Sequence, residues 1–214
     1  MEDKNAVFNN RKEAAELLAT QLMRFSGENA VVLGIPTGGA EVAFYVAKKI
    51  GARFSVLISK KLTDPEHPQI TVGAVCEEGT VFIDQHAKSK IGEAEILRCR
   101  SEILRRVLLY REGKPLPQIK GQTVILVDDG IETGMTMTAA LLLCVRHGAA
   151  RVVVAAPVAR TAFSEELKEA DELVVLVQPP GFKTVSQAYQ HFDELSESTI
   201  KSFMAQAIRA GDEH

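Results

Sequence analysis

The sequence has few cysteines, no long apolar run and no excess of basic residues, and each shortage excludes a class of protein. Only three cysteines stand among 214 residues, and none forms a Cys-x-x-Cys pair. This excludes a disulfide framework and the common zinc sites, and it leaves Cys144, in the apolar run LLLCV, as a small core residue. No apolar run approaches the length of a transmembrane helix. The formal net charge of −3 argues against a nucleic-acid or anionic-membrane partner.

The remaining composition is that of an ordinary globular chain. It is 46% hydrophobic and 25% charged, which suffices to bury a core. The segment 1–18 is charged and contains no apolar signal core, so we expect a cytoplasmic protein.

Continuous valine-rich runs alternate with helical patterns along most of the chain. Runs too short for helices and without polar alternation are typical of buried parallel strands. They cover 30–35, 53–59, 123–127, 151–158 and 172–177. Apolar residues at helical spacing predict helices over 10–25, 41–50, 91–110, 137–148, near 162–170 and over 196–210. We therefore expect an α/β fold, with a central parallel sheet covered by helices on both faces, Rossmann-like in form.

The middle of the chain departs from this rhythm. Two prolines and several charges in 60–69 predict a loop, and 70–75 with 80–84 read as an antiparallel hairpin outside the main sheet. In the following helix, arginines are interspersed with glutamates, which is typical of a solvated face. These arginines are Arg98, Arg100, Arg105 and Arg106.

We expect one domain over 1–214. Its core would comprise about 26–60 and 120–178. A flexible loop, hairpin and helix would occupy about 61–119, and a C-terminal hood about 179–214. The polar segment of about 76–95 would form a lid that excludes water from a reaction.

The stretch VILVDDGIETGMTM, residues 124–137, carries the strongest functional signal. Asp128 and Asp129 follow a buried strand, at the edge of a parallel sheet where ligands bind. The glycine-rich turn after them opens a helix, whose N-terminus binds phosphate, and Thr133 and Thr136 add hydroxyl donors. Paired carboxylates suit vicinal hydroxyls with a divalent metal nearby. The pattern indicates a sugar phosphate, because a helix cap would need only one acid.

This stretch closely resembles the signature of type I phosphoribosyltransferases, which bind 5-phosphoribosyl 1-pyrophosphate (PRPP) with Mg²⁺. The resemblance implies that Asp128 and Asp129 hold the ribose hydroxyls, with Mg²⁺ bound indirectly or through PRPP. The 5′-phosphate would be wrapped, largely by backbone, by Glu132, Thr133, Gly134, Met135, Thr136 and Met137. Glu132 is also a candidate for proton transfer at the acceptor, its alternative being a solvated loop acid.

The resemblance extends over most of the chain. The segment IPTGGAEVA looks like the family's pyrophosphate loop, and two lysines follow the next strand. The implied pyrophosphate site comprises Pro36, Thr37, Gly38, Gly39, Lys60 and Lys61. The chain is most similar to an uncharacterised subgroup whose loop reads Pro-Arg-Gly-Gly. Here Thr37 replaces that arginine. A plain turn at 37–39 and a solvated Lys61 remain the alternatives.

The resemblance implies an enzyme that transfers the phosphoribosyl group from PRPP to a nitrogenous acceptor, such as a nucleobase. It also implies a homodimer. A second reading is a PRPP- or nucleotide-binding sensor with little catalysis, which the missing arginine favours. A sugar-phosphate hydrolase would need a nucleophile that the sequence does not offer. Tyr189 and Phe192 either face the acceptor or pack in the core.

Overall fold

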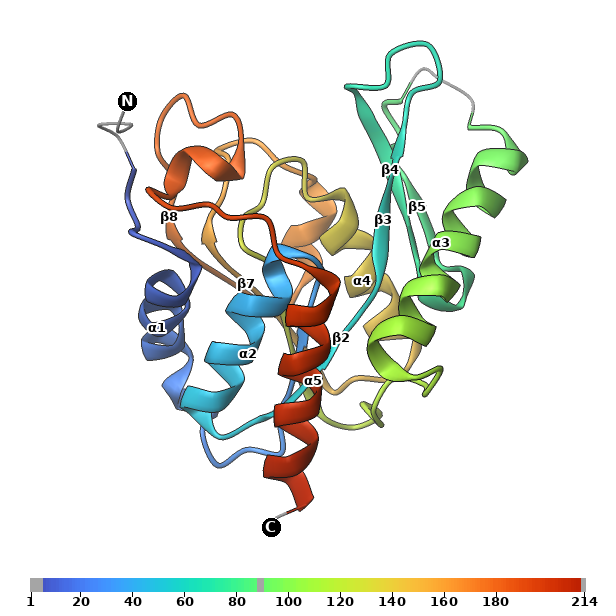
Figure 1. The fold of residues 1–214 in the computed structure, drawn as a ribbon. Helices are drawn as coiled ribbons and strands as arrows, with labels where there is room; N and C mark the ends of the chain where they lie inside the picture. Colours follow the sequence, from blue (N-terminus) through green and yellow to red (C-terminus); the bar gives the residue numbers. More distant parts are fainter. Residues whose placement is uncertain (1–5, 88–90, 213–214) are drawn as a thin grey trace.

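The computed structural model describes residues 6–87 and 91–212, and Figure 1 shows their arrangement as two sheets with flanking helices. The strands are β1 (Val31–Gly34), β2 (Arg53–Val56), β3 (Ser59–Thr63), β4 (Thr71–Cys76), β5 (Val81–Ile83), β6 (Thr123–Val127), β7 (Arg151–Val158) and β8 (Glu172–Val177). The α-helices are α1 (Arg11–Leu22), α2 (Gly38–Ile50), α3 (Glu93–Arg111), α4 (Met135–Arg146) and α5 (Glu197–Asp212).

The main sheet is parallel throughout, as its valine-rich strands predict. Its order is β2-β1-β6-β7-β8. Strands β1 and β6 are neighbours although they are far apart in sequence, and Gly34 lies opposite Val127. The loops that follow these two strands therefore start side by side at the carboxyl edge of the sheet.

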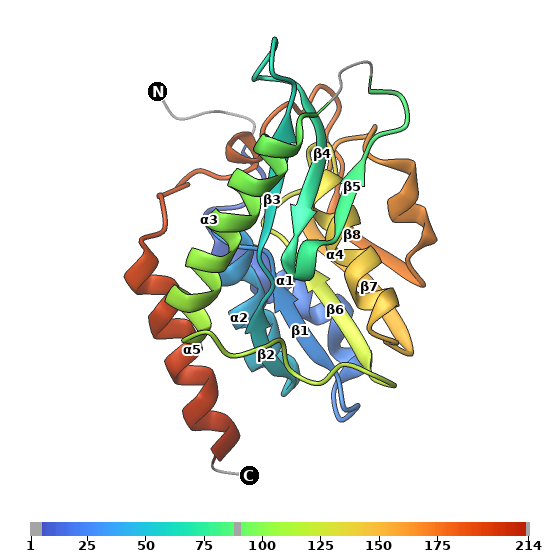
Figure 2. The same cartoon turned by 90° about the vertical axis from the view of Figure 1, so that its right-hand side faces the viewer.

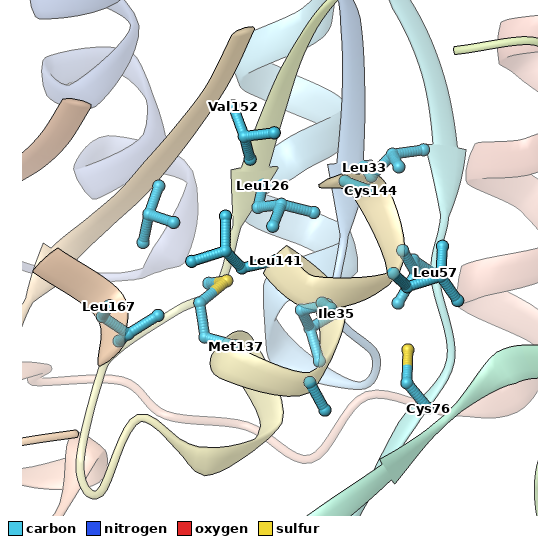
Figure 3. Close-up of a cluster of buried hydrophobic side chains, with 14 of the residues drawn as sticks. Leu33, Ile35, Leu57, Cys76, Leu126, Met137, Leu141, Cys144, Val152 and Leu167 are labelled. Carbon is cyan, nitrogen blue, oxygen red and sulfur yellow. The ribbon is translucent and has the colours of Figure 1, made fainter. Parts of the chain in front are cut away.

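Alternate residues of β1, β6, β7 and β8 point into two different cores, which confirms helices on both faces. On one face, Val32 and Ile125 pack against α1 and α2. On the other, Leu33 and Leu126 pack against α4 and part of the small sheet, and Figure 3 shows this cluster with Met137 and Cys144 of α4. The strands have no polar alternation because neither face meets solvent.

The small sheet is antiparallel, in the order β3-β4-β5, and the predicted hairpin forms two of its strands. One side of this sheet meets α4, and the other packs against α3. Figure 2 shows α3 lying in front of the small sheet.

Several predicted elements differ from those observed. The predicted loop over 60–69 is correct only for 64–69, because Ser59–Thr63 forms β3 and pairs with β4. The predicted strand over 53–59 is two strands that belong to different sheets. The helix predicted near 162–170 is a short 3-10 helix, Glu165–Glu169. Residues 88–90 of the predicted lid lie outside the described residues.

The segment 188–191, before α5, pairs with residues 7–9 near the start of the described chain. Phe8 forms an isolated parallel bridge with Tyr189, and the N–H of Gln190 donates to Phe8 O at 2.9 Å.

Within 6–87 and 91–212, no helix has the length and apolar character needed to cross a membrane.

Candidate active site

A cavity of about 550 Å³ opens where the loops after β1 and β6 meet. The N–H of Ile35 donates to Val127 O at 2.9 Å, which ties the two loops together at their starts. The cavity brings together most of the predicted site residues, from three segments of the chain: the loop between β1 and α2, β3, and the loop between β6 and α4, with the first residues of the two helices. They are Pro36, Thr37, Gly38, Lys60, Lys61, Asp128, Asp129, Glu132, Thr133, Gly134 and Thr136.

Three predicted residues are not among those that line the cavity. The side chains of Met135 and Met137 are buried, and both belong to the core beneath α4. Their only groups suited to an anion are backbone N–H groups at the start of the helix. Gly39 lies behind Asp128: a Cβ added to it would fall 2.7 Å from Asp128 Oδ1.

Asp128 and Asp129 are largely withdrawn from solvent at the floor of this cavity. Asp128 Oδ1 accepts a hydrogen bond of 2.9 Å from the N–H of Asp129. Burial, followed by the charge of Asp129, raises the pKa of Asp128 well above its usual value. A ligand that brings hydroxyl donors or positive charge would stabilise the ionised form of a carboxyl group in this position.

Asp129 is fixed by two partners that are distant in sequence. Arg11 donates from Nε to Asp129 Oδ2 at 2.7 Å, and the hydroxyl of Tyr189 donates to Asp129 O at 2.6 Å. Burial raises the pKa of Asp129, while the Arg11 charge opposes that rise. The two neighbouring acids therefore stand in different environments, since Asp129 has a guanidinium partner and Asp128 does not.

Two glycines let these carboxylates approach the first loop closely. A Cβ on Gly38 would lie 1.7 Å from Asp129 Oδ2, a distance that no real contact allows. The glycine pair is therefore required by the packing against the acids. The pyrophosphate role of 37–39 stays a prediction. The Pro36–Thr37 peptide bond is cis.

The loop after β6 leads directly into α4. Gly134 adopts φ 79°, a left-handed conformation that favours glycine, and no side chain of the described residues caps the helix. Thr133, Gly134 and Thr136, at the start of this helix, all line the cavity. An uncapped helix N-terminus carries partial positive charge and suits a phosphate group.

Glu132 bridges three parts of the site. Its Oε2 accepts from Lys61 Nζ of β3 at 3.1 Å, and its Oε1 accepts from the N–H of Val185 at 3.1 Å. Lys61 is thus paired with Glu132, although its side chain is 48% exposed.

Several residues that line the cavity were not predicted from the sequence. Arg11, Ser59, Arg106 and Val185 all line the cavity. The assignment of Arg106 to a solvated face was wrong, because its side chain is only 25% exposed and reaches this site. Phe192 also lines the cavity, with the guanidinium of Arg11 3.9 Å from its ring centre, whereas Tyr189 is buried.

Comparisons with known proteins identify the family of this chain. A family model described as phosphoribosyl transferase domain matches residues 3–191. Proteins named "Putative phosphoribosyl transferase" in Mycobacterium tuberculosis strains CDC 1551 and H37Rv are each 34% identical over 210 residues. The match covers 95% of this chain and 47% of theirs, so the chain spans about half the length of these curated relatives.

Two solved structures have related folds. The protein TT1426 from Thermus thermophilus is 36% identical, with a TM-score of 0.79 over 93% of this chain and 98% of that chain. A hypothetical protein from Neisseria gonorrhoeae, solved with bound ppGpp, is 13% identical, with a TM-score of 0.53 over 93% and 97% of the two chains. At that identity the second likeness shows the fold alone. The family match over most of the chain, the relatives above 30% identity and the sheet topology together establish that this chain belongs to the phosphoribosyltransferase domain family and has the type I fold.

Proposed function

We propose that the protein transfers the 5-phosphoribosyl group of PRPP to a nitrogenous acceptor, with release of pyrophosphate. One observation carries the proposal: a single cavity joins a carboxylate pair, an uncapped helix N-terminus and several cationic side chains. These are the groups needed for the hydroxyls, the phosphate and the pyrophosphate of one ligand.

Each part of the site has a role in this reaction. Asp128 accepts hydrogen bonds from the ribose hydroxyls, and Arg11 keeps Asp129 in place beside it. The start of α4 holds the 5′-phosphate through backbone N–H groups. The acceptor nitrogen forms a bond to the anomeric carbon as the bond to pyrophosphate breaks, and the acceptor loses one proton. Cations near the departing pyrophosphate stabilise its charge.

Magnesium fits this site as a companion of the ligand. The described residues contain no group of three or more His, Cys, Asp or Glu placed to hold a metal ion by themselves. Asp128 supplies oxygen donors, and Mg²⁺ commonly combines one or two carboxylates with substrate phosphates. When bound, the ion would neutralise charge on the leaving pyrophosphate.

Glu132 is the candidate base for the acceptor proton. Both its oxygens accept hydrogen bonds, so it must exchange Lys61 for the acceptor N–H before it can act. We expect Glu132→Gln to lower kcat at least tenfold while the Kd for PRPP stays within about twofold. Normal turnover in this variant would contradict the role.

A second candidate is a PRPP- or nucleotide-binding sensor. The observation that favours it is Thr37, since the loop after β1 brings no cation to the pyrophosphate. Because the Neisseria protein of similar fold was solved with ppGpp, that nucleotide belongs in the ligand panel.

Pyrophosphate release separates the two candidates. The protein is incubated with PRPP, Mg²⁺ and a panel of purine and pyrimidine bases, and released pyrophosphate is measured, with Asp128→Asn as the control. An enzyme releases pyrophosphate with one class of base, and Asp128→Asn does not. Binding of PRPP or ppGpp without release for any base would favour the sensor.

A further inference from the structure

Arg106 occupies an unusual place on α3. Cys99, Ile103 and Tyr110 form a buried stripe at spacings of four and seven residues, and they pack against the small sheet. Arg106 falls within that stripe, three residues after Ile103 and four before Tyr110. A helix seldom directs an arginine along its buried face unless the charge has a partner there.

The side chain of Arg106 is held from one side only. Its Nε donates to Glu102 Oε1 at 2.9 Å, on the preceding turn of α3. Hydrogen bonds from Arg105 and then from Arg106 lower the pKa of Glu102 to about 2 against the opposing effect of burial, so this partner stays ionised. Among the described residues, Nε is the one Arg106 nitrogen with a hydrogen bond, which leaves its two terminal nitrogens for the cavity that it lines.

The position of α3 determines from which side Arg106 reaches the cavity. The small sheet separates α3 from α4, because its two sides pack against different helices. Arg106 therefore approaches from the side opposite to the phosphate loop at the start of α4. Lys60 lies on the same side as Arg106, since it alternates along β3 with Lys61 and shares a face with Leu62 of the α3 cluster.

We propose that Arg106 binds the pyrophosphate group of PRPP and supplies, from α3, the guanidinium that the loop after β1 lacks at Thr37. The inference rests on the proposed use of PRPP. A guanidinium donates two parallel hydrogen bonds to phosphate oxygens, and Glu102 orients it for this contact. Lys60 and Arg106 then face the leaving group from one side.

The chain offers a matched control in Arg105. It is also bonded to Glu102, at 3.0 Å, but it is 50% exposed and forms a second ion pair with Glu197 of α5. It does not line the cavity. Arg105→Gln thus removes the same charge from the same helix, but it removes no side chain that lines the cavity and keeps the Arg106–Glu102 hydrogen bond.

The proposal is tested by calorimetric titration of four proteins: the wild type, Arg106→Gln, Arg106→Lys and Arg105→Gln. Each is titrated with three probes, which are PRPP with Mg²⁺, pyrophosphate with Mg²⁺, and ribose 5-phosphate. In Arg106→Gln we expect the affinities for PRPP and pyrophosphate to fall by roughly 10- to 100-fold, as for a lost charged hydrogen bond. The affinity for ribose 5-phosphate should stay within about twofold, Arg106→Lys should recover part of the loss, and Arg105→Gln should match the wild type.

Other outcomes separate the two levels of the proposal. Unchanged pyrophosphate affinity in Arg106→Gln overturns the role of Arg106 and leaves the proposed function standing. An equal loss for ribose 5-phosphate also overturns it, because that would mark a structural effect. If the wild type binds pyrophosphate through Arg106 but does not bind PRPP, the anion site stands and the proposed function falls. If it binds neither, both fall.

Discussion

At the scale of single residues, the two adjacent acids of the site differ in their hydrogen-bond partners. Asp129 is locked by Arg11 and by the hydroxyl of Tyr189, whereas Asp128 faces the cavity without a cationic hydrogen-bond partner among the described residues. Placing two carboxyl groups together in a buried site opposes folding, since each loses solvation and repels the other. Such a pair is typical of a binding function rather than of a structural one.

Tyr189 gives a prediction with a defined pH dependence. Burial raises the pKa of its hydroxyl, so folding favours the neutral phenol. The resulting stability is complete below the ordinary tyrosine pKa of about 10 and is lost as pH rises toward the folded-state value. We expect Tyr189→Phe to cost about 1–3 kcal/mol at about pH 8, because Asp129 O loses its donor.

The cost should shrink above about pH 10, where ionisation stabilises only the unfolded wild type. Urea unfolding of both proteins at about pH 8 and about pH 11 measures it. A difference that stays constant, or grows, with pH would show that the hydroxyl is not held in its neutral form by the fold.

At the scale of elements, a buried ion pair fixes α3 to the junction between the two sheets. Arg111 at the end of α3 donates to Glu77 and, from Nη1, to Val56 O of β2 at 2.8 Å. Glu77 also accepts from the N–H of Ile58 at 2.7 Å, just before β3. Both side chains are at most 5% exposed. The pair therefore sets where β3 and α3 present their cations.

Removing one member of this pair should be far more costly than removing an exposed one. Arg111→Met leaves the Glu77 carboxylate buried without its cation, which costs roughly 3–5 kcal/mol. Lys114→Met is the control, because the Lys114–Glu112 pair is more than 60% exposed on both sides and should change stability by less than about 1 kcal/mol. Urea unfolding measures both. Similar small losses in the two variants would contradict the role of the buried pair.

The sequence predicted those elements whose patterns are local. Continuous valine runs identify β1, β6, β7 and β8, because strands covered on both faces need no polar side. Strand β3 was not predicted, because the adjacent Lys60 and Lys61 interrupt the apolar pattern of this short edge strand. Both lysines line the cavity. The position of Arg106 in line with the buried residues of α3 is a local signal in the sequence. The mixture of arginines and glutamates in this helix, taken alone, does not reveal it.

Arg11 could not have been found by pattern. Its main partners, Asp129 and Asp193 O, lie 118 and 182 positions away in the chain. Only the folded arrangement brings α1 against the end of β6 and the segment before α5. The acidic pair itself was recognisable because its residues, its loop and its helix are contiguous.

At the scale of the whole molecule, the start of the described chain and the segment before α5 meet at one side of the site. Arg11 donates to Asp193 O at 2.8 Å and lies over Phe192, while the N–H groups of Gln190 and His191 donate to Phe8 O and Asn9 O at 2.9 Å. The segment before α5 is thus positioned by the N-terminal region rather than by the main sheet alone.

Arg11→Gln should loosen this segment specifically. Losing the contacts to Asp193 and Phe192 should speed hydrogen exchange at the amides of Gln190 and His191 by about tenfold or more. Lys12→Gln is the control, since Lys12 contacts the Tyr45 ring on α2 at 5.5 Å instead. Equal protection in the wild type and Arg11→Gln would mean that Arg11 does not hold this segment.

The most direct test of the account is calorimetric titration of PRPP with Mg²⁺ into the wild type and Asp128→Asn. The substitution preserves shape and relieves repulsion, so the variant should unfold at the same temperature or a higher one. We predict that the wild type binds and that Asp128→Asn binds roughly 10- to 100-fold more weakly, because a charged acceptor for the ribose hydroxyls is lost. Absence of binding in the wild type, or equal affinity in a folded Asp128→Asn, would contradict the assignment of this cavity to PRPP.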